Sequence, residues 1–315
     1  MTSAVLLDRA AVEAAVSPER AVDAVRDAFV AHARGEWTMP PKVYVTNYPA
    51  GDFRAMPALG GGHALLKWIT SFPGNPERGL PTVTGVVLVS DASTGELRAV
   101  LDAASVTALR TGAAAVLAAE ALGRPDARSA AVVGAGVNGR AAARTFLARG
   151  HDVALWDVDA GRAARVAEEL GCRVAASRED ALAADLLVTV TPGREVLLGE
   201  GSLRPGQHVS LMGADGPGKA EVAGLELARS RLFCDDWEQA SHGGELAHAV
   251  EDGLVAREEV TAIGDVLAGT APGRSSDDEI TMFDSTGLAI QDLAIALAAL
   301  QAADADALPR LELSR

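Results

Sequence analysis

The spacing of apolar residues changes along the chain and predicts two parts. The first part combines helical spacing with short strand-like runs. Ser17 and Pro18 precede a segment in which apolar residues return at helical spacing until Gly35, which predicts an amphipathic helix. From 40 to 102 the apolar runs are short and are separated by Gly, Pro, Asn and Asp, which predicts a mostly antiparallel sheet. An Ala-rich helix is expected over 106–122. The expected strands cover 42–48, 54–58, 65–70, 83–90 and 97–102.

Strand-like and helix-like segments alternate in the second part, beyond a linker at 124–128. Alternation of this kind is typical of a parallel sheet with helices on both faces. We therefore predict an α/β fold in which a doubly wound Rossmann domain over 123–286 accompanies a mixed α+β domain over 1–122, completed by a C-terminal helix within 287–315. The expected strands cover 129–133, 152–156, 185–190, 208–212 and 280–283, and the expected helices cover 138–149, 161–170 and 288–300.

A glycine-rich turn stands between the first strand and the first helix of the predicted Rossmann domain. Gly134, Gly136 and Gly139 form a GxGxxG pattern. In this pattern the glycines allow a tight turn, close approach of a pyrophosphate and close packing of helix on strand, while the helix N-terminus faces the negative charge. The cofactor-binding residues expected from this turn are Gly134, Gly136, Val137, Asn138 and Gly139.

Further cofactor contacts are expected where later strands of the same domain end. Asp157 lies eighteen residues past Gly139, at the end of the next strand, where a carboxylate accepts a hydrogen bond from a ribose 2′-hydroxyl. Because Asp157 and Asp159 repel a 2′-phosphate, we expect NAD in preference to NADP. Thr191 and Met212 end two other strands at the edge where such sheets bind ligands.

The charge balance restricts the partners. The 315 residues include 28 Lys and Arg against 43 Asp and Glu, a formal net charge of −15. Such a surface repels phosphate backbones and anionic lipid, so we expect neither nucleic acid nor a membrane as partner. The apolar run at the N-terminus is too short for a signal peptide, and we expect a cytoplasmic protein. The two cysteines and six histidines lack metal-ligand spacing, so no metal is expected.

Six polar motifs outside the glycine-rich turn carry a resemblance to a known family. In chain order they are PKVY (41–44), GDFRAMPA (51–58), LKW with FPGNP (66–76), LRTGAAA (109–115), GADGPGKAE (213–221) and FDSTGLAIQD (283–292). In this order they resemble the ornithine cyclodeaminase/mu-crystallin family, and within it the alanine dehydrogenases of archaeal type. The resemblance implies a homodimer in which the first domain binds substrate and forms the dimer contact.

The resemblance also implies which residues bind substrate. Arg54, Lys67 and Arg110 match the residues that bind the α-carboxylate of an amino or keto acid in that family, and Lys42 lies near them in the pattern. This agrees with their chemistry, because a guanidinium forms two parallel bonds to a carboxylate and a lysine adds a movable point charge. Thr111 matches a residue that contacts the cofactor pyrophosphate.

Asp215 matches the catalytic carboxylate of the family and follows an apolar strand. We expect Asp215 to act as general base, with Lys67 as the second catalytic residue, and we expect both to face the nicotinamide. Lys219 and Glu221 are expected to orient this loop by an ion pair.

We therefore predict an NAD-dependent oxidoreductase that acts on the C–N bond of a small L-amino acid, or on the corresponding keto or imino acid in reverse. Two alternatives stay open: an ornithine or lysine cyclodeaminase-type lyase that recycles NAD, and a catalytically inactive protein that binds small molecules with NAD(P)H. Arg54 aligns with the position where a cyclodeaminase presents a carboxylate to the distal amine, so it disfavours ornithine. Asp215 disfavours the inactive binding protein.

Overall fold

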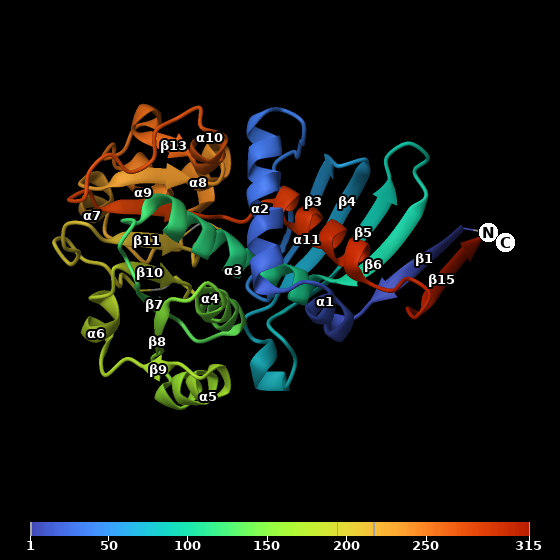
Figure 1. Cartoon of the computed structure of the whole chain (residues 1–315), viewed down its shortest axis with the longest axis horizontal. Coiled ribbons are helices and arrows are strands. Elements are labelled where there is room, and N and C mark those ends of the chain that lie inside the picture. Colours follow the sequence, from blue (N-terminus) through green and yellow to red (C-terminus); the bar gives the residue numbers. More distant parts are fainter. Residues whose placement is uncertain (1, 194, 217, 315) are drawn as a thin grey trace. The chain divides into compact units, whose positions relative to one another are not determined.

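The computed structural model describes residues 2–193, 195–216 and 218–314, and the chain forms two compact units. The first unit comprises Met1–Arg110 and Leu288–Arg315, and the second comprises Thr111–Gly287. Each unit is built around a sheet of its own (Figure 1).

The first unit contains a seven-stranded sheet in the order β15-β1-β6-β5-β4-β3-β2. The strands from β2 to β6 pair antiparallel with their neighbours, whereas β1 runs parallel to β6 and pairs antiparallel with β15. This confirms the mostly antiparallel sheet expected from the short apolar runs. The strands are β1 (Thr2–Leu7), β2 (Val43–Asn47), β3 (Gly51–Gly60), β4 (His63–Ser71), β5 (Val83–Asp91), β6 (Leu97–Asp102) and β15 (Arg310–Ser314).

The two faces of this sheet differ in what covers them. Helix α11 (Ala289–Ala302) packs on β3, β4 and β5 and on helix α2 (Pro18–Ala33), while α1 (Arg9–Ala15) contacts β1 and β6 (Figure 1). We call the face under α11 the inner face; Leu65, Ile69 and Val87 on it are buried. Alternate residues point to the opposite, outer face, where large apolar side chains are exposed. They include Val43, Val45, Leu66, Trp68 and Val86.

The second unit contains an eight-stranded sheet in the order β13-β12-β14-β11-β10-β7-β8-β9, in which all the described pairings are parallel. The first strand of the unit, β7, lies inside the sheet, and the chain proceeds to β8 and β9 on one side and to β10 on the other. This confirms the doubly wound Rossmann sheet, with a topological switch point between β7 and β10. The strands are β7 (Ser129–Val133), β8 (Asp152–Trp156), β9 (Arg173–Val174), β10 (Leu186–Thr189), β11 (His208–Leu211), β12 (Arg231–Cys234), β13 (Val260–Ala262) and β14 (Thr281–Asp284).

Helices cover both faces of the parallel sheet. Ala131 and Val133 of β7 belong to one buried cluster with Ala181, Leu227 and Ala240 from short helices that follow later strands. Two longer helices, α4 and α5, contact β7 or β8, and the second half of the long helix α3 packs closely on α4. The helices not yet named are α3 (Ala103–Leu122), α4 (Val137–Ala148), α5 (Ala160–Leu170), α6 (Arg178–Leu182), α7 (Gly224–Ala228), α8 (Trp237–Gly243), α9 (Leu246–Glu251) and α10 (Ile263–Ala268), with 3₁₀ turns at Asn75–Arg78 and Arg257–Glu259.

The division between the units falls inside α3, between Arg110 and Thr111, whereas the sequence placed it after residue 122. The reason lies in close contacts within the second unit. A Cβ on Gly112 would lie 2.8 Å from the carbonyl of Ala141 in α4, and Ser210 of β11 donates a hydrogen bond of 2.8 Å to the carbonyl of Ala115. The second half of α3 therefore belongs to the Rossmann core, although the helix itself is continuous.

Within the part of the chain that the structure describes, α3 is the helix that is long and apolar enough to cross a membrane by length and composition. In the structure 72% of its apolar window is buried, as in the core helix of a soluble protein, so the length and hydropathy are weak evidence for a span.

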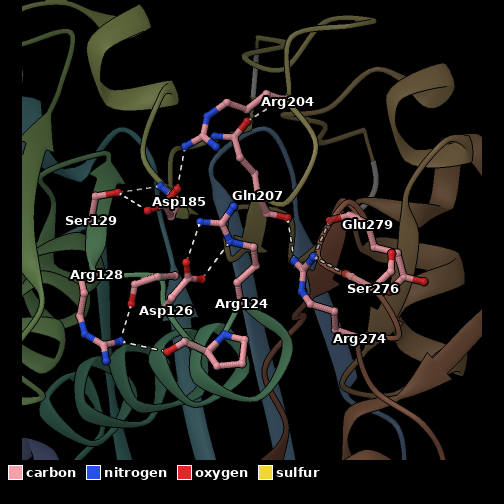
Figure 2. Close-up of polar contacts among 12 residues, drawn as sticks. Arg124, Asp126, Arg128, Ser129, Asp185, Arg204, Gln207, Arg274, Ser276 and Glu279 are labelled. Carbon is pink, nitrogen blue, oxygen red and sulfur yellow. Dashed lines mark hydrogen bonds and ion pairs between the residues drawn. The ribbon is translucent and has the colours of Figure 1, made fainter.

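Polar side chains join the amino ends of the parallel strands (Figure 2). Asp185, before β10, accepts hydrogen bonds from Ser129 of β7 at 2.8 Å and from Arg204 at 2.7 Å. Arg274 donates to the carbonyl oxygens of Gln207 at 3.0 Å and Glu279 at 2.5 Å. These bonds fix the edge of the sheet opposite the edge where ligands bind in Rossmann folds.

Candidate active site

Four cationic side chains of the first unit, Lys42, Arg54, Lys67 and Arg110, form what we call the cation cluster. The strand register explains how they meet. Arg54 of β3 stands opposite Ile69 of β4, and Met56 stands opposite Lys67, so Arg54 and Lys67 point to the inner face. The charge of Lys42, just before β2, also acts on Lys67.

Lys67 and Arg110 share one carboxylate, which belongs to Asp292 in the first turn of α11. Lys67 Nζ lies 2.6 Å from Asp292 Oδ2, and Arg110 Nε lies 3.6 Å from Asp292 Oδ1. The side chain of Lys67 is 1% exposed and that of Asp292 is 0% exposed, while that of Arg110 is 12% exposed. Two buried positive charges thus face one buried negative charge, and Thr107 adds a weaker contact of 3.4 Å to Lys67 Nζ.

The environment lowers the pKa of Lys67 from 10.5 to about 8. Burial is the main cause, because it disfavours the charged form, and repulsion from Arg110 and Lys42 adds to it. Asp292 opposes these effects by attraction and by hydrogen bonding. Lys67 is therefore mostly an ammonium at neutral pH but close to the range in which it exchanges its proton.

Arg54 has a carboxylate partner of its own. Its Nε donates to Asp52 Oδ1 at 2.6 Å and its Nη2 to Asp52 Oδ2 at 3.3 Å, and its guanidinium lies 5.3 Å from the ring centroid of Tyr44. Asp52 is on the inner face but is occupied by Arg54, so it is poorly placed to receive a second ammonium group.

The glycine-rich turn joins β7 to α4 in the second unit, as predicted. Gly134 has a φ of +107°, and a Cβ on Gly139 would lie 1.7 Å from the carbonyl oxygen of Gly134, so the fold itself requires glycine at both positions. At Gly136, by contrast, a Cβ would meet no described atom within 4 Å. The protein has no internal need for glycine at 136, and the open space there fits the approach of an external group to the backbone. Next to it, Val137 is 63% exposed and Asn138 is half-buried.

Asp157 follows β8 and binds the glycine-rich turn. Its Oδ2 accepts a hydrogen bond of 2.7 Å from the backbone N–H of Ala135, and its Oδ1 accepts one of 2.8 Å from that of Asp159. Arg162 of α5 lies 3.4 Å from Oδ2. The carboxylate is thus fixed beside the turn, at the position where Rossmann folds bind a ribose.

Thr191 and Met212 lie at the carboxyl ends of β10 and β11, as expected. The backbone N–H of Met212 donates to the carbonyl of Thr189 at 2.8 Å, which extends the pairing of the two strands. A buried carboxylate, Glu221, accepts hydrogen bonds from the hydroxyl of Thr189 at 2.7 Å and from the backbone N–H of Thr191 at 2.8 Å. Burial raises the pKa of Glu221, and the threonine hydroxyls oppose that effect. Thr111, buried in α3, lies in the same unit.

Asp215 lies in the loop after β11, where its side chain is 36% exposed. The prediction of an ion pair between Lys219 and Glu221 is wrong, because Lys219 Nζ pairs with Asp215 and Glu221 is buried against the threonines. The two side chains diverge because Lys219 is half-exposed while Glu221 has no exposed surface. Pro217 of this motif lies outside the described residues.

Several residues of these sites were not assigned a role from the sequence. Lysine occurs only at positions 42, 67 and 219, all of them in or beside the predicted sites, and this scarcity is a signal that the sequence offers. Asp52, Asp292 and Glu245 carry no such signal in the sequence, because their partners are set by the fold. Glu245 accepts hydrogen bonds from the backbone N–H of Glu221 at 2.8 and 3.0 Å.

The Rossmann sheet, the glycine-rich turn and the buried cation cluster together define the class: a two-unit α/β protein of dinucleotide-binding type. The model of the ornithine cyclodeaminase/mu-crystallin family matches residues 2–305, and the chain belongs to this family. It is 42% identical over 300 residues to alanine dehydrogenase of Archaeoglobus fulgidus, covering 92% of each chain.

Two solved structures are also similar. An archaeal alanine dehydrogenase dimer with bound NAD has a TM-score of 0.93 at 39% identity, covering 99% of this chain and 100% of that one. The iminosuccinate reductase of Paracoccus denitrificans in complex with NAD⁺ has a TM-score of 0.90 at 28% identity, with the same coverage.

Proposed function

We propose that the protein is an NAD-dependent oxidoreductase that acts on the C–N bond of a small L-amino acid, as an alanine dehydrogenase does, or reduces the corresponding imine. The observation that carries the proposal is the surplus of positive charge in the cation cluster. Lys67 and Arg110 are largely buried and share the single carboxylate of Asp292. A buried charge without compensation is costly, so this arrangement favours an anionic ligand of the size of an α-carboxylate.

The donors of the cluster suit a carboxylate. The guanidinium of Arg110 offers paired N–H groups and the ammonium of Lys67 adds a point charge, so that together they fix both the position and the orientation of the ligand. Arg54, with its guanidinium set by Asp52 and Tyr44, adds a further cation on the same face. An amino acid bound in this way has its Cα and amine in a defined orientation, which by itself is worth several kcal/mol of barrier.

The second unit has the residues for the dinucleotide. Gly136 leaves open space at the N-terminus of α4, Asp157 is fixed beside the turn, and Thr111, Thr191 and Met212 complete the proposed binding residues. When bound, NAD takes up or returns the two electrons exchanged at the C–N bond. Asp157 and Asp159 disfavour a 2′-phosphate by repulsion, which supports NAD over NADP.

We assign proton transfer to Asp215, which accepts a proton from the amine or from the attacking water. Its oxygen pairs with the ammonium of Lys219 and its side chain is 36% exposed, so it can be reached by an amine or a water molecule. Lys67, with a pKa of about 8, also exchanges a proton near neutral pH and is the second proposed acid–base group.

The lyase alternative is disfavoured by the contacts of Asp52. A cyclodeaminase acting on ornithine needs a carboxylate for the distal ammonium, and the carboxylate on the inner face of β3 is neutralised by Arg54. Ammonia release without a change in nicotinamide absorbance would support the lyase. Tight NAD(H) binding without turnover of any substrate would support a binding protein.

A substrate panel read by both absorbance and ammonia separates these functions. It contains alanine, ornithine, lysine, proline, pyruvate with ammonia, and cyclic imines. We expect NADH formation with a small apolar amino acid and none with ornithine. Asp215→Asn should lose at least about 1,000-fold in kcat, in the range seen for essential acid–base groups, while NAD affinity stays the same. Retained turnover in Asp215→Asn would refute the role of this carboxylate.

We further propose a homodimer that forms through the outer face of the first sheet. Trp68 is 38% exposed there, Val86 41% and Val43 57%, and contiguous apolar surface of this kind marks an interaction site. Trp68→Glu should shift the protein toward the monomer in analytical ultracentrifugation. Val196→Glu is the matched control, since Val196 is 52% exposed in the second unit. A dimer of unchanged stability in Trp68→Glu would place the interface elsewhere.

A further inference from the structure

Asp292 occupies an unusual position for a carboxylate. It has no exposed surface, and its two oxygens face different cations, Oδ2 toward Lys67 and Oδ1 toward Arg110. The residue lies in the first turn of α11, whose start is fixed by Gln291, which accepts a hydrogen bond of 3.1 Å from the N–H of Leu288. The positive end of the helix dipole also lies beside this carboxylate.

The cations depend on this carboxylate to different degrees. Arg110 stays charged in any protein environment, whereas a buried lysine readily loses its proton. The charged groups that act on Lys67 are Asp292 from α11, Arg110 from α3 and Lys42 from the segment before β2. Only Asp292 among them favours the ammonium.

We propose that Asp292 is a positioning residue that keeps Lys67 as an ammonium and sets Lys67 and Arg110 as a pair of charged donors for the substrate carboxylate. The proposal rests on the proposed function for the identity of that ligand, but not for the state of Lys67. Without Asp292, a neutral lysine beside a charged arginine has the same total charge as the intact trio. What Asp292 adds is therefore the second charged donor, and not a change in net charge.

The scarcity of lysine makes the charge of Lys67 directly measurable. Protein labelled with ¹³C at lysine Cε gives three lysine signals, one each for Lys42, Lys67 and Lys219. Lys67→Arg identifies the signal of Lys67, which should titrate near pH 8 in the wild-type protein. In Asp292→Asn the same signal should titrate at least about one unit lower, since one ion pair of this kind shifts a pKa by one to three units. An unchanged titration would overturn the proposal whether or not the protein oxidises amino acids.

Activity supplies the second readout. In Asp292→Asn, the KM for the amino acid should rise at least about tenfold at pH 8, and less at pH 6, where Lys67 regains its proton. Glu226→Gln is the control for the loss of a buried, arginine-paired carboxylate, because Glu226 binds Arg229 in the second unit. It should lower stability and leave the pH profile of kcat/KM as it is. A KM in Asp292→Asn that is raised equally at all pH values would show a structural role only.

Asp292→Glu is a second variant that keeps the test decisive if Asp292→Asn does not fold. The longer side chain retains the negative charge but moves it by one methylene. Lys67 should keep its titration within about half a unit, while KM rises because the two donors are displaced. A KM equal to that of the wild-type protein would contradict the positioning role. If no amino acid is turned over by the wild-type protein, the proposed function fails and the titration alone decides the role of Asp292.

Discussion

Two arginines, one in each unit, use the same side chain in opposite ways. In the second unit Arg274 donates to the backbone carbonyls of Gln207 at 3.0 Å and Glu279 at 2.5 Å (Figure 2). It also donates to the carbonyl of Leu122 at 2.7 Å and to the hydroxyl of Thr281 at 2.9 Å. In the first unit the contact of Arg110 among the described residues is an ion pair of 3.6 Å, and its buried Nε makes no hydrogen bond there.

The difference separates a structural arginine from one placed for a ligand. The partners of Arg274 are fixed parts of the chain and use most of its five donors, so an external anion has little to bind. Arg110 has donors left over and shares its carboxylate with a second cation. Buried polar groups are normally satisfied, so an unsatisfied cation in a positive surrounding indicates an anion that comes from outside the chain.

Matched substitutions test this contrast and should have the largest effects. Arg110→Met should lower kcat/KM for the amino acid by about 10²- to 10³-fold, since loss of one buried charged partner costs about 2–5 kcal/mol of binding. Its thermal stability should change little. Arg274→Met should instead lower the free energy of unfolding by about 2–4 kcal/mol, because several carbonyls lose their donor, and leave KM as it is. Steady-state kinetics and thermal unfolding of both variants provide the comparison.

The opposite pattern would reverse the assignment. If the unfolding temperature of Arg110→Met falls while its KM stays normal, Arg110 is a structural residue. The proposal that the cation cluster binds a substrate carboxylate would then be contradicted.

The sequence predicted the frame of the two units better than the contacts within them. The strands of both sheets follow apolar runs that any half-buried or buried strand requires, so β4, β7 and β11 were predicted to within two residues. The elements of 235–275 were not predicted, because helices as short as α9 contain too few turns to show a period. Strands β1 and β15 at the edge of the first sheet were also missed.

The site shows the same division. The positions of Arg54, Lys67 and Arg110 were expected from motif order, and the structure brings Lys67 and Arg110 to one carboxylate. The sequence did not identify Asp292 as this carboxylate. Lys67, Arg110 and Asp292 lie in β4, α3 and α11, which are far apart in the chain. Local patterns carry no information on such long-range partners.

Glu245 in the second unit should affect the pH dependence of stability and not the kinetics. Its pKa is raised to about 9 by burial and by the charges of Glu221 and Asp284. The folded protein therefore retains a proton that the unfolded chain releases above pH 4.5. The free energy of unfolding should accordingly fall as pH rises toward 9, by up to about 1.4 kcal/mol per pH unit from this group. In Glu245→Gln this contribution disappears, which denaturant unfolding at pH 6, 7, 8 and 9 measures. Equal pH slopes in the two proteins would show that Glu245 is ionised in the fold.

The smallest expected effect is on the preference for NAD over NADP. It depends on Asp157, which has partners within the chain and a proposed partner in the dinucleotide. Asp157 serves the fold through the N–H groups of Ala135 and Asp159, and it is also proposed to accept from the ribose. Asp157→Ser removes the charge that repels a 2′-phosphate and leaves a hydroxyl for the turn, while Arg162 becomes available to a phosphate. The ratio of kcat/KM for NAD to that for NADP should fall by at least about tenfold, or 1.4 kcal/mol. Asp180→Ser is the control, because Asp180 likewise accepts from a backbone N–H and pairs with an arginine, Arg173, in the same unit. If the ratio is unchanged in Asp157→Ser while stability falls, then Asp157 has only its internal partners, and the dinucleotide preference is set by other residues.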